Sequence, residues 1–170
     1  MKRTPTSAFL LLLLLLACQA CQTTHYFLVR HAEKRDSSPD TPLSEVGWDR
    51  ALSLRNQLLG KRIDAVFSSD YTRTRQTAQP LADALSTPLS IYRPDTTGSL
   101  ATVLKKMNGK NVLVVGHSNT IPPLVAGLSG ETVAIADNDY DNLFIVRVKR
   151  SPLGKKVDLT KTTYGKPSPQ

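Results

Sequence analysis

The segment that most constrains the fold runs from residue 26 to residue 34, where four apolar residues lead directly into Arg30, His31 and Glu33. A short run of aromatic and β-branched residues is typical of a buried strand. In an α/β protein, such a strand places the residues that follow it at the carboxyl edge of the sheet, where ligands bind. We therefore expect Arg30 and His31 at the mouth of a site, with His31 as a nucleophile and Arg30 as an anion clamp.

Strand-like and helix-like patterns alternate along the rest of the chain. Ser44 is expected to cap a helix that ends at Gly60, and Pro80 is expected to kink or delay the next one. This alternation predicts an α/β fold, with a mostly parallel central sheet and helices on both faces. The expected strands are 26–29, 63–67, 88–92, 111–115, 143–149 and 157–163, and the expected helices are 44–59, 72–85, 100–107 and 122–127.

The N-terminus has the pattern of a signal peptide. Lys2 and Arg3 form a basic region before an apolar run of ten residues at 8–17. Ten helical residues cover about 15 Å, roughly half of the hydrocarbon core of a bilayer, so the run is too short for a membrane span. We expect residues 1–17 to be a signal peptide that takes no part in the fold.

The residues from Leu15 to Cys18 resemble the lipobox of bacterial lipoproteins, whose cysteine is lipidated and becomes the new N-terminus. The resemblance implies lipidation at Cys18, a lipidated linker at 18–24 and a lipid anchor in a membrane of the bacterial envelope. The alternative is ordinary cleavage near Ala20, with release into the periplasm. If Cys18 is acylated, Cys21 has no partner, which excludes an internal disulfide and a cysteine-based zinc site.

The length of 170 residues suits one main domain, expected at 25–165 and followed by a loose tail at 166–170. Loss of the two basic residues of the signal lowers the net charge from +8 to +6. Such a surplus suits nucleic acid, anionic lipid or a phosphorylated substrate. No basic helix or interleaved aromatic stripe occurs, so we expect no nucleic-acid partner. The basic pairs at 149–150 and 155–156 are expected to form a solvated face.

Three of the expected strands lead into polar residues of one kind. The first is followed by Arg30 and His31, the second by residues 68–75 with two arginines, and the fourth by His117. Arginine matches phosphoryl oxygens with a planar, permanently charged fork. One imidazole can attack phosphorus and a second can donate a hydrogen bond to the same oxygens. The sequence therefore predicts phosphoryl transfer through a phosphohistidine, without a metal ion.

These blocks resemble the motifs of the histidine phosphatase superfamily, which includes cofactor-dependent phosphoglycerate mutase and the small phosphohistidine phosphatases. The motifs are LVRHAE at 28–33, SSDYTRTRQTA at 68–78 and VGHSNT at 115–120. The resemblance implies a phosphoglycerate mutase-like fold and a histidine phosphatase domain at 25–165. It makes His31 the nucleophile and His117 the second imidazole, and it makes Arg30 and Arg73 the phosphate clamp.

The same alignment gives roles to neighbouring residues. Arg73 rather than Arg75 matches the family arginine, and Arg75 is expected on the surface or in a pair along its helix. Ser118 and Asn119 are expected to contact the substrate or to orient their loop.

The proton donor to the leaving group has no direct counterpart. Larger members of the family use an acidic residue in an inserted segment, for which this chain leaves little room. We expect Glu33 to take this role, with Asp95 as an alternative. The purely structural alternative is that Glu33 pairs with Lys34 or Arg35 at the rim.

The histidine spacing argues against a metal centre, since no His-x-His or His-x-x-x-His pair occurs and two arginines would repel a cation. We therefore expect no cofactor and predict a metal-independent phosphatase. Its substrate would be a phosphomonoester or a phosphoramidate, either a small phosphorylated molecule or a phosphohistidine peptide. The rival hypothesis is a catalytically inactive, anion-binding envelope lipoprotein.

Overall fold

The computed structural model describes residues 21–168, so the predicted signal peptide at 1–17 and the predicted lipidation site, Cys18, lie outside the described residues. Within 21–168, no helix has the length and apolar character needed to cross a membrane. In chain order the strands, α-helices and short 3₁₀-helices (η) are β1 (Gln22–Arg30), α2 (Glu45–Leu58), η1 (Leu59–Lys61), β2 (Ala65–Ser69), α3 (Thr72–Ala84), β3 (Leu89–Tyr92), η2 (Pro94–Thr96), α4 (Thr97–Lys105), β4 (Asn111–Gly116), α5 (Ile121–Ser129), β5 (Asn142–Ser151) and β6 (Gly154–Thr163).

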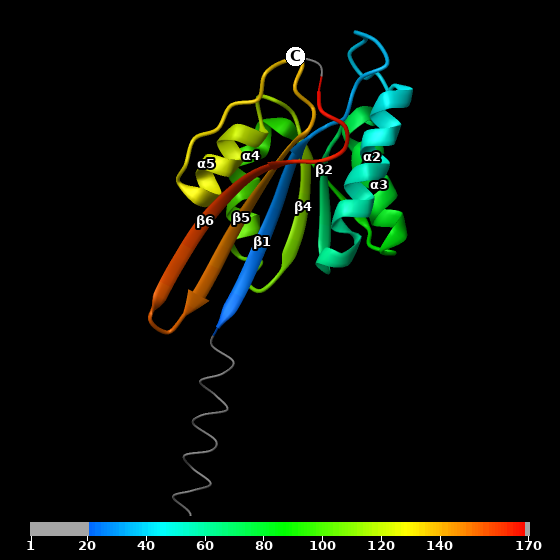
Figure 1. The fold of residues 1–170 in the computed structure, drawn as a ribbon. Coiled ribbons are helices and arrows are strands. Elements are labelled where there is room, and N and C mark those ends of the chain that lie inside the picture. Colours follow the sequence, from blue (N-terminus) through cyan, green and yellow to red (C-terminus); the bar gives the residue numbers. More distant parts are fainter. Residues whose placement is uncertain (1–20, 169–170) are drawn as a thin grey trace, which may run out of the picture.

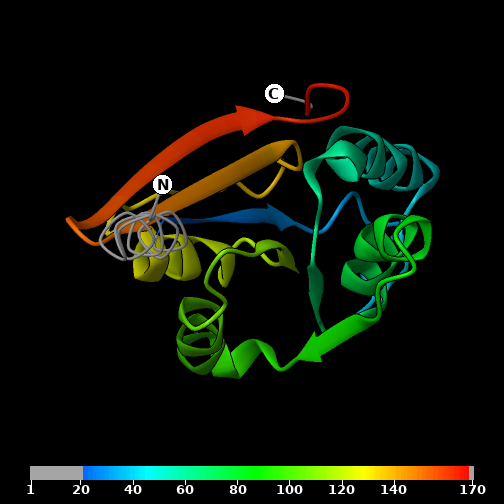
Figure 2. The same ribbon diagram turned by 90° about the horizontal axis from the view of Figure 1, so that it is seen from below.

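A six-stranded sheet forms the centre of the domain, in the order β3-β2-β4-β1-β5-β6. The first four strands of this order pair in parallel, whereas β5 and β6 are antiparallel to their neighbours. Figures 1 and 2 show α4 and α5 on one face of the sheet and α2 and α3 on the other. The predicted α/β architecture, a mostly parallel sheet with helices on both faces, is confirmed.

The central strand β1 contributes to the core on both faces, because successive side chains of a strand point to opposite sides. Tyr26 and Leu28 belong to the buried cluster formed with α4 and α5. Phe27 and Val29 belong to the cluster formed with α2 and α3. Burial on both faces explains why the run at 26–29 is apolar throughout instead of alternating.

Three local predictions need correction. β1 begins at Gln22, because residues 22–25, expected as a polar lead-in, pair with β5. The chain continues through Gly60 as η1, where we expected a helix end. α3 begins at Thr72 and runs through Pro80, because the packing of its buried stripe on the sheet outweighs the hydrogen bond that proline cannot make.

The C-terminal tail, expected to be loose, is held by hydrogen bonds in its described part. The carbonyl of Lys166 accepts a hydrogen bond from Nη1 of Arg50 at 2.8 Å. The hydroxyl of Ser168 accepts hydrogen bonds from the backbone N–H groups of Tyr140 at 2.8 Å and Asp141 at 3.1 Å. These bonds tie the tail to α2 and to the loop that precedes β5.

Candidate active site

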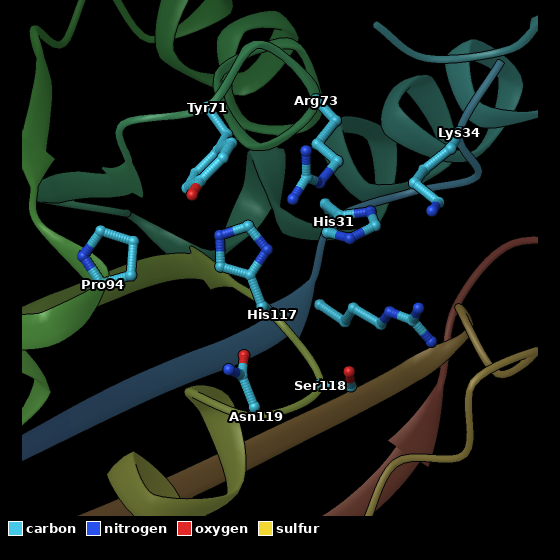
Figure 3. A pocket seen from close by; sticks show the side chains of 9 residues that line it. His31, Lys34, Tyr71, Arg73, Pro94, His117, Ser118 and Asn119 are labelled. Atoms are coloured by element: carbon cyan, nitrogen blue, oxygen red, sulfur yellow. The ribbon is translucent and has the colours of Figure 1, made fainter. Parts of the chain in front are cut away.

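A pocket of about 470 Å³ opens at the carboxyl end of the parallel strands (Figure 3). β1, β2 and β4 each lead into it, as the polar residues after these strands predicted. The pocket is lined by Arg30, His31, Lys34, Tyr71, Arg73, Pro94, His117, Ser118 and Asn119. Six of the seven residues predicted for catalysis or substrate binding are therefore together in one cavity, and the missing one is Glu33.

His31 follows β1 directly and has one nitrogen free for chemistry. Its backbone N–H donates to the carbonyl of Gly116 at 2.9 Å, which continues the pairing of β1 with β4 beyond the strand. Its Nδ1 lies 2.8 Å from the carbonyl oxygen of Ala32. Because a carbonyl only accepts, Nδ1 must carry the proton, so the lone pair of the neutral ring is on Nε2.

The environment of His31 keeps the ring neutral. The residue is only 4% exposed. Burial, together with the positive charges of Arg30 and Arg73 and the ring of His117, lowers the pKa of His31 to about 3 despite the hydrogen bond to Ala32. At neutral pH the ring is therefore an unprotonated base, which is the form in which an imidazole can attack phosphorus.

His117 follows β4 and faces His31 across the pocket. The two ring centroids are 5.4 Å apart and the rings meet edge to face. The Nε2 of His117 lies 2.8 Å from the hydroxyl of Ser69, and its backbone N–H donates to the hydroxyl of Thr120 at 2.8 Å. Burial and the charges of Arg73 and Arg30 lower the pKa of His117 to about 4.

The residue before this histidine has to be glycine. A Cβ on Gly116 would lie 2.7 Å from the hydroxyl oxygens of both Thr120 and Tyr92. Tyr92 is itself anchored, since its hydroxyl donates to the carbonyl of Val115 at 3.2 Å. Gly116 therefore lets β3 and the start of α5 approach β4 closely at the point where His117 enters the pocket.

Arg30 and Arg73 lie on either side of His31, and each has a donor to spare. Nη1 of Arg30 donates to the backbone carbonyls of Ala136, Asp137 and Asp139 at 2.8 to 3.2 Å. These bonds hold the guanidinium in place. The Nε atoms of Arg30 and Arg73 are buried and lack a hydrogen-bond partner within the described structure. An oxyanion placed between the two side chains would satisfy both donors.

The two arginines of the second motif are separated as predicted. Nη1 of Arg73 donates to the carbonyl of Pro39 at 2.8 Å, which brings the turn-rich loop after β1 to the mouth of the pocket. Arg75 lies outside the pocket lining and forms an ion pair with Asp70 on the surface. The prediction that Arg73 is the pocket arginine and Arg75 a surface residue agrees with this geometry.

Two tyrosines complete the walls, and the sequence analysis missed both. The Tyr71 ring packs edge to face on His117, with centroids 5.0 Å apart, and the guanidinium of Arg73 lies 4.5 Å from its centre. Tyr140 lies under the guanidinium of Arg30 at 4.3 Å, and its ring centroid is 6.0 Å from that of His31. Tyr71 is inside the quoted second motif and could have been found there, whereas Tyr140 comes from a loop without a motif.

Two further residues that the sequence analysis gave no role hold the reacting groups in place. Thr77 on α3 accepts a hydrogen bond from the N–H of Ala32 at 2.9 Å, and this fixes the turn after His31. Ser69 bonds to His117 and also donates to the hydroxyl of Thr74 at 3.0 Å. Hydroxyl side chains at the carboxyl ends of strands were the signal available, but their partners depend on the packing of α3.

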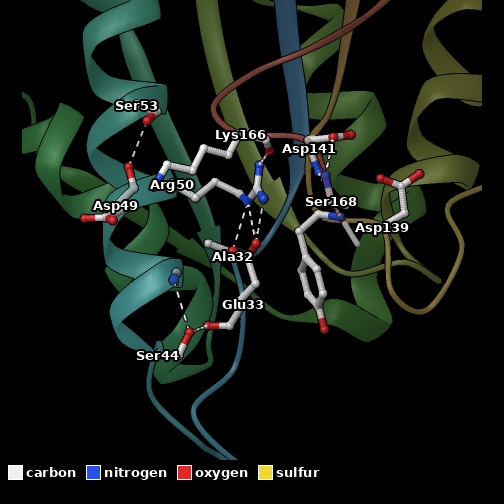
Figure 4. A network of polar contacts seen from close by, with 12 residues as sticks. Ala32, Glu33, Ser44, Asp49, Arg50, Ser53, Asp139, Asp141, Lys166 and Ser168 are labelled. Carbon is white, nitrogen blue, oxygen red and sulfur yellow. Dashed lines mark hydrogen bonds and ion pairs between the residues drawn. The ribbon is translucent and has the colours of Figure 1, made fainter. Parts of the chain in front are cut away.

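The prediction that Glu33 donates a proton is contradicted by its position (Figure 4). Its carboxylate accepts hydrogen bonds from Nε of Arg50 at 2.9 Å and from Nη2 at 2.6 Å. Arg50 is on α2 and is only 3% exposed. Glu33 is absent from the pocket lining, and its partner is Arg50 instead of the expected Lys34 or Arg35. The alternative donor, Asp95, is exposed and pairs with Arg93 at 2.9 Å.

The Glu33–Arg50 pair has a structural role at the centre of a polar network. Nη1 of Arg50 also donates to the carbonyls of Tyr164 at 3.0 Å and Lys166 at 2.8 Å. α2 can approach the turn after His31 only because residue 47 is glycine, since a Cβ there would lie 2.3 Å from the carbonyl oxygen of Glu33. The network therefore supports the nucleophile from behind.

No group of three or more histidine, cysteine, aspartate and glutamate residues in the described part of the chain could hold a metal ion. The pocket instead gathers three cationic side chains: Arg30, Arg73 and Lys34. Together with the two neutral imidazoles, this set can bind a phosphoryl group, present a nucleophile to it and donate hydrogen bonds to its oxygens.

Comparisons with known proteins agree with this geometry. A model of the histidine phosphatase superfamily (branch 1) matches residues 26–93, which include Arg30, His31 and Arg73 but not His117. The protein histidine phosphatase SixA, solved with tungstate, superposes with a TM-score of 0.61 at 22% identity, over 82% of this chain and 96% of that chain. A mycobacterial glucosyl-3-phosphoglycerate phosphatase gives 0.64 at 12% identity, over 85% of this chain and 100% of the other.

A variant of phosphoserine phosphatase from Entamoeba histolytica, solved with phosphoserine, gives a TM-score of 0.59 at 14% identity, over 83% of this chain and 96% of that one. No curated protein matches the chain. At these identities the superpositions show a shared fold, and the arrangement of residues in the pocket has to be argued from this chain itself.

Proposed function

Because this chain belongs to the histidine phosphatase superfamily by its sequence match and its fold, we propose that it is a phosphatase that works through a phosphohistidine on His31. The observation that carries the proposal is the position of one neutral imidazole between two arginines. The Nε2 of His31 has its lone pair free, and Arg30 and Arg73 each have an unpaired buried Nε–H beside it. A bound phosphoryl group would satisfy these donors and put phosphorus in reach of Nε2.

The reaction has two displacement steps at phosphorus. In the first, Nε2 of His31 forms a bond to phosphorus while the bond to the leaving group breaks, and the leaving group takes a proton. In the second, water attacks the phosphohistidine, which releases inorganic phosphate and restores the neutral ring. His117 and the arginines hold the phosphoryl oxygens in both steps, so negative charge moves within a field of fixed donors.

The leaving group is the basis for choosing between substrates. The side chains that line the pocket within the described residues include no carboxyl group, and Glu33 is engaged by Arg50. An alkyl phosphate leaves as a strongly basic alkoxide and needs a proton from the enzyme, a contribution of about 10²- to 10⁴-fold. A phosphoramidate such as phosphohistidine leaves as an imidazole, which is a far weaker base. We therefore favour phosphohistidine in a peptide or protein, the class of substrate that the name of SixA also indicates.

The test compares three substrates with different leaving groups. We expect turnover of a phosphohistidine peptide and of an aryl phosphate, and rates at least 10²-fold lower with an alkyl phosphate, because the first two need no general acid. Enzyme quenched during turnover should carry phosphate that is labile in acid and stable in base, as expected for a bond to nitrogen.

Matched variants supply the controls. His31→Ala should abolish turnover, and Arg73→Ala should lower kcat/KM strongly, whereas Arg75→Ala removes the same side chain from the same helix outside the pocket and should have little effect. Absence of turnover with all three substrates would favour the rival hypothesis of an inactive anion-binding protein. Equal losses in Arg73→Ala and Arg75→Ala would refute the assignment of the clamp.

A further inference from the structure

The end of the sheet opposite the pocket brings the start of β1 next to the β5–β6 hairpin. β1 runs toward the pocket, so its first residue, Gln22, lies at the far end of the molecule (Figure 1). The register places Gln22 opposite Arg150 and Thr23 opposite Lys149 on β5. β5 ends there at Ser151, and the hairpin turn follows. The beginning of the described chain and the hairpin turn are therefore neighbours.

The hairpin sets like charges directly opposite each other. Lys149 pairs with Lys156 across the two strands, and Arg150 pairs with Lys155. Lys149, Lys155 and Lys156 are exposed. Like charges at directly opposed positions destabilise a sheet. Asp158 offsets part of this charge through ion pairs with Arg147 at 2.9 Å and Lys156 at 3.4 Å. The remaining repulsion would be relieved by an external anionic surface.

The turn itself presents an apolar side chain. Leu153 is 100% exposed, and it lies between Pro152 and Gly154 at the tip of the hairpin. A hollow of about 340 Å³ at this tip is lined by Leu153 together with Lys149, Lys155 and Lys156. A leucine surrounded by lysines combines a side chain that can enter the acyl region with ammonium groups that can contact headgroups.

Neighbouring turns add positive charge to the same end. Parallel strands start on one side of a sheet, so the turns before β2 and β4 lie on the side where β1 begins. Lys61 and Arg62 precede β2, and Lys105 and Lys106 precede β4. Lys110 in the second of these turns is neutralised by Asp64 at 3.0 Å. The basic character of this end is therefore not confined to the hairpin.

We propose that this end of the domain, the hairpin tip with Leu153 and its lysines, docks on the surface of an anionic membrane. Charge complementarity selects an anionic surface, and the exposed leucine favours a lipid bilayer over a soluble polyanion. The predicted acylation site agrees with this placement, since the four residues from Cys18 to Gln22 can span at most about 14 Å. Docking at this end would turn the pocket away from the bilayer and toward soluble substrates.

The test measures which lysines a membrane protects. The full chain is reconstituted in vesicles of phosphatidylcholine with and without phosphatidylglycerol, treated briefly with an amine acetylating reagent and analysed by peptide mass spectrometry. We expect acetylation of Lys155 and Lys156 to fall several-fold only in the anionic vesicles, and to recover in high salt. Lys34 and Lys166, at the pocket end, serve as internal controls and should react equally in both vesicles.

Two variants make the outcome decisive. Each lysine near an anionic membrane strengthens binding about fivefold, so Lys149→Gln with Lys156→Gln should weaken docking about 25-fold and expose Lys155 to the reagent. Because these changes also remove an opposed cationic pair, the variant should unfold at the same or a higher temperature than wild type. Leu153→Ser should reduce protection, whereas Leu52→Ser, at an exposed leucine of α2, should not.

Equal acetylation of Lys155 in neutral and anionic vesicles would overturn the proposal. So would protection by heparin as strong as that by vesicles and unaffected by Leu153→Ser, since this pattern would identify a soluble polyanion as the partner. Neither readout depends on catalysis, so a failure here is distinguishable from a failure of the proposed phosphatase activity.

Discussion

Mild acid should destabilise this protein through the two histidines of the pocket. The pKa of His31 is lowered to about 3 and that of His117 to about 4, mainly because both rings are buried. In the unfolded chain a histidine has a pKa of about 6.5. Below that value the unfolded state binds protons that the folded state refuses, so the free energy of unfolding falls as the pH is lowered. The loss stops once the pH passes below the folded pKa.

The size of the effect follows from these values. Between pH 7 and pH 5, each histidine with so low a folded pKa contributes a loss of about 2 kcal/mol, because 1.5 pH units below 6.5 correspond to about 1.4 kcal/mol each. Two such residues give about 4 kcal/mol, a large part of the 5 to 15 kcal/mol that typically stabilises a domain. The aspartates with lowered pKa, which are Asp36, Asp40, Asp64 and Asp158, titrate below this window and do not confuse it.

Urea denaturation at half-unit steps from pH 7 to pH 5 measures the effect. The comparison is between wild type, His31→Gln and His117→Gln, and the quantity compared is the change in unfolding free energy with pH, so that cavity or packing effects of the substitutions cancel. Each variant should lose about 2 kcal/mol less than wild type over this range. Identical losses in all three proteins would refute the claim that the folded pocket keeps these rings unprotonated.

Three further predictions concern residues around the pocket. Glu33→Gln should lower the unfolding free energy by about 3 kcal/mol in urea titrations, because it leaves buried Arg50 without a counter-charge, yet kcat should change little; a loss of 10² or more would make Glu33 the proton donor after all. Gly47→Ala should cost about 1 to 3 kcal/mol in the same assay, because its Cβ meets the Glu33 carbonyl at 2.3 Å, whereas Gly60→Ala, with nothing within 4 Å, should be neutral. Ser69→Ala should lower kcat roughly tenfold, the value of one hydrogen bond to His117, with KM nearly unchanged in steady-state assays.

The fold and the pocket's principal residues could be predicted because they depend on short-range patterns. Apolar runs of four to six residues, each followed by polar residues, located β1, β2 and β4 and implied that Arg30, Arg73 and His117 converge. The spacing of the second motif separated Arg73 from Arg75. A strand carries its successor to the sheet edge whatever the rest of the chain does, so such inferences need little knowledge of packing.

The errors arose where a side chain's partner comes from a distant element. Glu33 is two residues from His31, but its carboxylate meets Arg50 on α2, and that pairing depends on the close approach permitted by Gly47. Tyr140 reaches the pocket because Arg30 binds three carbonyls of the loop before β5 and Ser168 holds the next backbone amides. Neither contact has a local sequence signature, since both join residues that are far apart in the chain.

The low pKa values of the two histidines and the unpaired donors of the two arginines have one explanation. A pocket with two guanidinium groups near two imidazoles excludes further positive charge, and this disfavours the protonated rings. A phosphate dianion reverses the balance, because it satisfies both Nε–H donors and attracts a proton to His117. Oxyanion binding should therefore restore most of the stability lost in acid, and the pocket is strained in the absence of the charge that it is built to receive.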